Sequence, residues 1–235
     1  RAYLANTVNL ADLAASFRLH KGAKLIILDT CREDPFATVR AEALAAAVAP
    51  KLPENTLYAF AAEPGEIASD VGPDGRHGPY AYALARAIRE IQGSAEQVFR
   101  RVRAEVTDFS EKTGIKQHPF VESTLTADVV LGRPPQATPL VDTAKTPRKR
   151  SAGGQSGTGA SGTPSKRIAL VIANGDYASA GVLPNPANDA KAIAAVLRKL
   201  GFEVFEKKNL KHTEVEVALI EFGKQARKAE WAMIY

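Results

Sequence analysis

The sequence predicts an α/β protein in which a mostly parallel, six-stranded sheet is flanked by helices on both faces. Strand-like and helix-like segments alternate along the chain, and alternating elements of this kind build parallel sheets. The strand-like segments are continuously apolar, as LIIL is at 25–28, which is typical of strands that are buried on both faces. Hydrophobic residues make up 45% of the 235 residues, enough to form a sizeable core.

The first part of the chain, residues 1–132, contains three segments of each type. Strands are expected over AKLIILD (23–29), NTLYAFAA (55–62) and TADVVLG (126–132), and helices over 37–49, 79–92 and 94–109. Ser94 followed by Gln97 predicts a capping box at the start of the last helix.

Residues 133–165 interrupt this alternation. The stretch is rich in Pro, Gly, Ser, Thr and Ala, and such a composition predicts a flexible, disordered linker. Its glycines do not form a phosphate-binding loop, because GTGASGTPSKRIALV leads into a strand and lacks the Gly-Lys-Ser/Thr entry to a helix.

The net charge of +5 is concentrated at this linker, in Lys145, Arg148, Lys149, Arg150, Lys166 and Arg167. No aromatic residues are interleaved with these charges, although stacking on single-stranded nucleic acid would need them. We therefore interpret the basic cluster as a solvated linker and expect no nucleic-acid partner.

Residues 166–235 resume the alternation after the linker. Strands are expected over 166–174, 202–206 and 231–235, and helices over 188–201 and 213–229. About 70 residues are near the lower limit for a self-sufficient core. Each part would also expose an apolar sheet edge. We therefore expect the strands of both parts to lie in one sheet.

The two ends of the chain indicate that it is a piece of a longer protein. It opens with Arg1 and stops at Tyr235 inside an apolar run. No run approaches the roughly 20 apolar residues that cross a bilayer, and no signal peptide opens the chain. The single cysteine excludes an internal disulfide framework.

That cysteine, Cys31, follows the strand 23–29 directly, and ligands bind outside the carboxyl ends of strands in open parallel sheets. A lone cysteine is often a small buried apolar side chain. Here Arg32, Glu33 and Asp34 come next, so the chain becomes charged at this point. A reactive thiol and a buried filler both fit the pattern.

Several motifs resemble the bacterial caspase-like peptidases, which are relatives of metacaspases and orthocaspases. LIILDTCREDPF (25–36) resembles their nucleophile segment, and YAFAAEPGEIASD (58–70) the loop after the next strand. The similarity extends through 78–88, 96–106 and 117–131. RIALVIANGDYASAGVLPNPANDAKAIAAVLRKLGFEV (167–204) resembles the opening of the same family's domain.

The family's order is reversed here. The resemblance implies that 1–132 is the C-terminal half of a caspase-like domain and 166–235 an N-terminal half, joined by the linker 133–165. Either the parent has tandem caspase-like domains, which the unstructured linker favours, or the domain is circularly permuted.

The resemblance also implies a cysteine endopeptidase acting on protein or peptide substrates without a metal or other cofactor. Cys31 would be the nucleophile, and Asp29 and Asp189 would line the pocket for the residue before the cleaved bond. Ser69 and Asp70 are weaker candidates for that pocket. Two carboxylates favour Arg or Lys, so cleavage after a basic residue is expected.

One part of the family's site has no match in the sequence. The general base is a His in a Tyr-x-Gly-His-Gly type segment after the third strand, and WAMIY (231–235) stops where it should begin. None of the four histidines, His20, His77, His118 and His212, matches that position, so we expect this chain alone to be inactive. The alternative function is a non-catalytic caspase-like scaffold or regulatory module.

Overall fold

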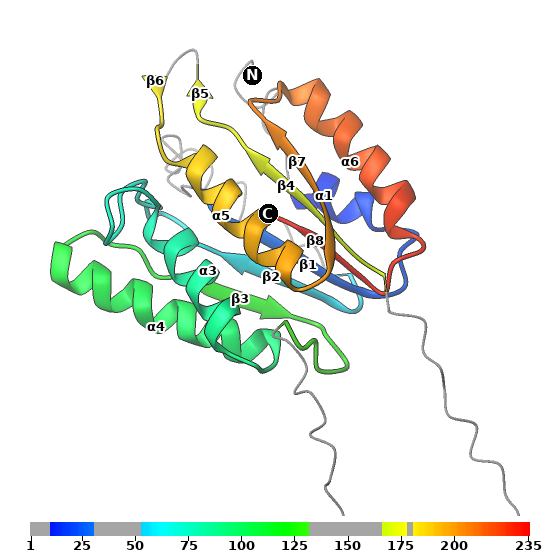
Figure 1. The fold of residues 1–235 in the computed structure, drawn as a ribbon, viewed down its shortest axis with the longest axis horizontal. Coiled ribbons are helices and arrows are strands. Elements are labelled where there is room, and N and C mark those ends of the chain that lie inside the picture. Colours follow the sequence, from blue (N-terminus) through cyan, green and yellow to red (C-terminus); the bar gives the residue numbers. More distant parts are fainter. Residues whose placement is uncertain (1–9, 31–52, 132–165, 178–180) are drawn as a thin grey trace, which may run out of the picture.

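A computed structural model of the chain describes residues 10–30, 53–131, 166–177 and 181–235. Its main element is a six-stranded sheet with the order β3-β2-β1-β8-β4-β7 (Figure 1). The strands of this sheet are β1 (Ala23–Leu28), β2 (Thr56–Phe60), β3 (Phe120–Ser123), β4 (Arg167–Ala173), β7 (Phe202–Lys208) and β8 (Trp231–Ile234). The described helices are α1 (Leu10–Ser16), α3 (Pro79–Glu90), α4 (Ala95–Thr113), α5 (Pro186–Lys199) and α6 (His212–Ala226).

Strand β8 joins the two parts of the chain. It runs parallel to β1, with Ala23 opposite Trp231 and Ile26 opposite Ile234. On its other side it runs parallel to β4, with Arg167 opposite the same Trp231. Only β3 is antiparallel to its neighbour, β2. The expectation of one mostly parallel, six-stranded sheet built from both parts is confirmed.

The strand expected at 126–132 was wrong. The antiparallel strand of this region is β3, and residue 130 makes only an isolated bridge to Ser94. The apolar side chains of Val129 and Leu131 are instead buried in the same core as helix α4, and the Val129 carbonyl accepts the backbone N–H of Ala95 at 2.7 Å. This segment therefore packs against the start of a helix, so its apolar pattern has a cause other than a sheet ladder.

Three further elements of the described chain were not predicted. Helix α1 precedes β1, and the short strands β5 (Asp176–Tyr177) and β6 (Gly181–Val182) pair antiparallel beside the main sheet. The helix expected at 37–49, the linker 133–165 and Cys31 lie outside the described residues. No described helix has the length and apolar character that a membrane span requires.

Each face of the sheet has its own apolar core, because successive strand side chains point to opposite faces. Leu25 and Ile27 of β1 pack in the core shared with α3, α4 and α5. Ile26 packs on the opposite face with residues of α1 and α6. Figure 1 shows the two groups of helices on the two sides of the sheet. The sheet is therefore the middle layer of three, as continuously apolar strands predict.

Helix α4 begins with the capping box that the sequence predicts. The Ser94 hydroxyl accepts the N–H of Gln97, and the Gln97 side chain accepts the N–H of Ser94. These bonds satisfy two N–H groups that the first turn of a helix otherwise leaves unpaired.

Candidate active site

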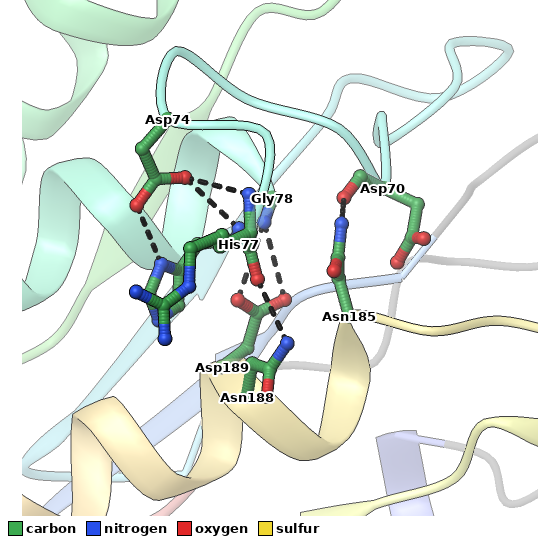
Figure 2. A network of polar contacts seen from close by, with 8 residues as sticks. Asp70, Asp74, His77, Gly78, Asn185, Asn188 and Asp189 are labelled. Atoms are coloured by element: carbon green, nitrogen blue, oxygen red, sulfur yellow. Dashed lines mark hydrogen bonds and ion pairs between the residues drawn. The ribbon is translucent and has the colours of Figure 1, made fainter.

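The candidate site lies at the carboxyl edge of the parallel strands, where ligands bind in sheets of this kind. Asp29 follows the last residue of β1, and the segment 61–78 connects β2 to α3 at the same edge. The start of helix α5 meets that segment from the second part of the chain (Figure 2). Residues far apart in sequence therefore share one region.

Asp29 is held by a tyrosine from the neighbouring strand. The hydroxyl of Tyr235 donates a hydrogen bond to Oδ2 of Asp29 at 2.9 Å. Burial raises the pKa of Asp29 from 3.8 to about 6; the bond from Tyr235 opposes this rise, and the charge of Asp70 adds to it. Asp29 is thus a half-buried carboxyl whose ionised form is disfavoured by its surroundings.

Asp189 lies in the first turn of α5 and is only 6% exposed. Its two carboxylate oxygens accept the backbone N–H of Gly78 at 3.2 and 3.3 Å. Burial, followed by the charge of Asp29, raises the pKa of Asp189 to about 8, although the bond from Gly78 opposes the shift. An acid at this position can be explained structurally, either by its bond with Gly78 or by its place at the N-terminus of a helix. Neither explanation excludes a role of Asp189 in binding.

Ser69 and Asp70 lie in the loop between β2 and α3. The Ser69 hydroxyl is engaged locally, because it donates to the carbonyl of Val71 at 3.1 Å. Burial raises the pKa of the Asp70 carboxyl, and the charge of Asp70 raises the pKa of both Asp29 and Asp189. The structure therefore brings Asp29, Asp70 and Asp189 into one electrostatic cluster, the acidic cluster, with Ser69 at its margin.

Helix α5 holds the loop of the acidic cluster through two asparagines that the sequence did not single out. Asn185 donates to the carbonyl of Asp70 at 2.6 Å, and Asn188 donates to the carbonyl of Arg76 at 3.1 Å. Figure 2 shows both side chains pointing from the start of α5 toward the loop, with Asp189 next to Asn188. Polar residues in a first helical turn have an ordinary capping role, which is why the sequence gave no sign of this contact.

Two tyrosines, the buried Tyr80 and the partly buried Tyr235, adjoin the acidic cluster and were also missed. Tyr80 is 1% exposed, and none of the residues that the structure describes forms a hydrogen bond with its hydroxyl. Burial and the charge of Asp29 raise the pKa of Tyr80 well above its ordinary value. The pKa of Tyr235 is raised in the same way by burial, Asp29 and Asp189. A tyrosine in an apolar run gives no sequence signal for such a position.

The four histidines make different contacts. His77 is the one in the loop of the acidic cluster, and its Nδ1 lies 2.7 Å from Oδ2 of Asp74. His118 pairs with Glu66 at 2.6 Å, and His212 with Glu216 at 3.3 Å. His20 is buried before β1, at the opposite end of that strand, with Nε2 3.2 Å from the Ala23 carbonyl.

The chemistry of this region is that of neighbouring carboxyl groups. Three carboxyl groups share an edge of the sheet, and the shifted pKa values of Asp29 and Asp189 report their mutual repulsion as well as their burial. Among the residues that the structure describes, no group of three or more His, Cys, Asp or Glu side chains is arranged to hold a metal ion. A cationic side chain with several N–H donors would match spread carboxylates better.

Comparison with known proteins gives the family. No curated protein matches the chain. A family model described as the caspase domain matches residues 4–130 and 166–235, which leaves the linker between the two matched parts. The matched parts include the acidic cluster, all six strands of the main sheet and the segment with Cys31. The chain therefore belongs to the caspase-domain family of cysteine peptidases.

Proposed function

We propose that this caspase-family peptidase acts on protein or peptide chains and cleaves them after Arg or Lys. The observation that carries the proposal is the acidic cluster at the end of β1, the strand that leads to Cys31. A guanidinium offers five N–H donors in a planar fork, so Asp29 and Asp189 could each accept from it. Asp70 would add negative charge from the loop side.

The shifted pKa values support a cationic partner. Burial and like charge hold Asp189 at a pKa of about 8 and Asp29 at about 6. A bound cation would favour the charged form of both carboxyl groups and would lower both pKa values. An acidic or apolar residue would leave their repulsion in place. Binding of Arg or Lys should therefore release protons from the site near neutral pH.

Cys31 is the proposed nucleophile, and it lies outside the described residues. Its place in the sequence supports the role, since it follows Asp29 by two residues. The thiolate would attack the carbonyl carbon of the scissile bond, and the C–N bond would break as the leaving amine takes up a proton. Water would then hydrolyse the thioester, which releases the new carboxyl end of the substrate and regenerates the thiol. The backbone N–H of Cys31 would help bind the oxyanion of the tetrahedral intermediate.

We propose further that none of the four histidines is the general base, so that the 235 residues alone cleave little. His118 and His212 are paired with Glu66 and Glu216, and His20 is buried before β1. His77 is the strongest rival, because Asp74 binds its Nδ1 as a carboxylate orients a catalytic imidazole. In Figure 2 the His77–Asp74 pair lies on the other side of the Gly78 backbone from Asp70.

The proposed domain organisation is that residues 1–132 and 166–235 operate together as one caspase-like unit of the metacaspase and orthocaspase type. The parallel pairing of β1 with β8 supports this arrangement. Tandem domains and circular permutation are both compatible with it. A protease site placed in 133–165 tests the unit: after cleavage, the two pieces should still elute together in size-exclusion chromatography under native conditions.

A binding experiment tests the specificity. The 235-residue chain with Cys31→Ala is titrated with fluorescent tripeptide amides ending in Arg, Lys, Asp or Leu. The Arg and Lys peptides should bind at least tenfold more tightly than the other two, and Asp29→Asn should weaken their binding by roughly tenfold to a hundredfold. Preference for the Asp or Leu peptide would overturn the proposal.

A cleavage experiment tests the base. The chain with its natural Cys31 should turn over the Arg peptide hardly at all, because general-base assistance is worth about 10²–10⁴-fold. Cysteine-dependent cleavage that His77→Ala abolishes would instead assign the base to His77. Suppose that the chain binds basic peptides, but that longer forms of the protein do not cleave them either. The scaffold function is then favoured.

A further inference from the structure

Gln117 has a buried side-chain amide that forms hydrogen bonds with the loop of the acidic cluster. It is 1% exposed and lies between helix α4 and strand β3. Its Oε1 accepts the backbone N–H of Ser69 at 3.0 Å, and its Nε2 donates to the carbonyl of Ala61 at 3.1 Å. One side chain thus bonds both ends of the segment 61–69, which leads directly into Asp70.

The position of Gln117 is itself fixed by neighbouring bonds. The Ser110 hydroxyl of α4 donates to the backbone carbonyl of Gln117 at 2.8 Å. The next residue, His118, makes two bonds to the Glu66 carboxylate, from its backbone N–H at 2.7 Å and through its ring Nδ1 at 2.6 Å. The segment 61–69 is therefore bound at its start, middle and end by two consecutive residues.

The loop is also bound by helix α5, and this further restricts its backbone. Beyond Ser69, the carbonyl of Asp70 accepts from Asn185 of α5 at 2.6 Å. The N–H of Ser69 and the carbonyl of Asp70 therefore bind side chains from two different parts of the chain, Gln117 and Asn185. Two bonds this close along the backbone restrict the backbone of Asp70, and with it the region from which its charge acts on Asp29 and Asp189.

A buried amide needs hydrogen-bond partners, but these need not be the Ser69 N–H and the Ala61 carbonyl. Burying an unsatisfied amide costs on the order of 1–3 kcal/mol, and any two backbone groups would avoid that cost. Gln117 spends its two bonds on the two ends of the loop that carries Ser69 and Asp70. An apolar residue of similar volume at this position would fill the core equally well.

We propose that Gln117 is a positioning residue for basic-residue specificity: its amide sets the place of Ser69 and Asp70 at the acidic cluster. The inference rests on the proposed function, because it assigns a role in the same pocket. Gln117 does not touch the substrate. It acts through the loop backbone. Its loss should weaken the affinity for a basic side chain more than an equally destabilising substitution elsewhere does.

The test compares Gln117→Met with a matched control in the Cys31→Ala chain. Thr124→Val is the control, because Thr124 also bonds the backbone of this region, at Thr56 and Pro53, but at the opposite end of β2. Both variants should lose similar thermal stability. Binding of the Arg tripeptide amide should weaken by roughly fivefold to twentyfold in Gln117→Met and less than twofold in Thr124→Val. Equal weakening in both variants would overturn the positioning role.

A second variant tests whether the two bonds of Gln117 hold the loop. In Gln117→Glu the neutral carboxyl group can accept from Ser69 and donate to Ala61, as the amide does, whereas the ionised group cannot donate. Amide hydrogen exchange over 62–70, measured relative to the parent chain at each pH, should be normal when the introduced carboxyl is protonated and faster when it is ionised. Relative exchange that does not change with pH would contradict the proposal.

Exchange is read without any ligand, and this separates the two hypotheses. If the exchange signature appears but the parent chain does not prefer the Arg peptide, the specificity is wrong and the positioning role in it is overturned. If the parent chain prefers the Arg peptide and Gln117→Met binds it equally well, the proposed function stands and the role of Gln117 is overturned.

Discussion

The hydroxyl of Tyr235 donates a hydrogen bond to Oδ2 of Asp29 at 2.9 Å, between residues that are 206 positions apart in the sequence. The Tyr235 backbone is fixed by β4, because its N–H donates to Leu170 at 2.9 Å and its carbonyl accepts from Ile172 at 2.8 Å. The carboxyl group at the end of β1 is therefore held by a residue of the second part of the chain. Its ionisation depends on how the two parts meet.

Tyr235→Phe should raise the pKa of Asp29 further above about 6, because the lost bond is the contact that favours the ionised carboxylate. Carboxyl-carbon NMR titration of Asp29 measures this. The free energy of unfolding at pH 7 should fall by about 1–2 kcal/mol. Tyr58→Phe is the control, since Tyr58 is buried on the opposite face with Ile26. A pKa of Asp29 that stays the same in Tyr235→Phe would show that this bond is not formed in solution.

Stability should fall as the pH rises from about 4 to about 8, because Asp189 binds a proton in the folded state over that range and not in the unfolded state. The raised pKa of Asp29 adds to the same trend up to about pH 6. Asp189→Asn should therefore flatten the decline and melt at a higher temperature than the parent at pH 8, at about 2–4 °C per kcal/mol recovered.

The control for this pH dependence is Asp108→Asn, because the Asp108 side chain is 60% exposed and forms an ion pair with Lys112 on the surface of α4. Its melting curve should follow that of the parent chain from pH 4 to pH 9. An Asp189→Asn variant that retains the full decline would mean that other groups cause it.

Asn185→Ala should destabilise the fold more than Asn188→Ala, although the two residues make similar bonds to the same loop. Asn185 is 4% exposed, so its removal leaves the Asp70 carbonyl without its bond in a poorly solvated place, at a cost of about 1–3 kcal/mol. Asn188 is exposed, and water can replace it at a cost of about 0.5 kcal/mol or less. Urea denaturation of the two variants gives the comparison; equal losses would contradict the burial argument.

Gly78→Ala should disturb the acidic cluster, because an added Cβ would lie 3.0 Å from the Ser69 carbonyl and 3.4 Å from Oδ2 of Asp189. The first of these contacts is with backbone, which cannot move aside as a side chain tip can. Overpacking of this kind costs about 1–3 kcal/mol, and the bond from Gly78 to Asp189 should lengthen. Loss of the Gly78 amide's protection from hydrogen exchange, beyond that of its neighbours, would verify the expectation; unchanged protection would refute it.

Most of the sheet could be predicted from the sequence because its strands are apolar on both faces. Residues 167–173 and 231–234 are such runs, and no helix period competes with them. The start of α4 was equally clear, because Ser94 and Gln97 interact within one turn of the chain. Segment 126–132 misled because burial against a helix and burial in a sheet leave the same apolar pattern.

The carboxyl groups of the candidate site were predicted through the family resemblance. Asp29 follows a strand, Asp189 lies at the start of a helix and Asp70 lies in the loop after a strand, and the structure places all three in the acidic cluster. Gln117, Asn185 and Tyr235 could not be identified from local sequence, because their partners lie 48, 115 and 206 positions away. Bonds to backbone groups add to the difficulty, since a carbonyl carries no information about residue type.

The central place of β8 has a consequence for how the protein is made. Ala23 pairs with Trp231, so β1 must wait until almost all of this chain has left the ribosome before it gains that neighbour. Until then β1 and β4 each present an open, apolar strand edge, and such edges invite pairing with other chains. Strand pairing between segments so far apart in the sequence is also slow to form. Productive folding should therefore depend on holding two unfinished half-sheets apart from other molecules until the strand that unites them arrives.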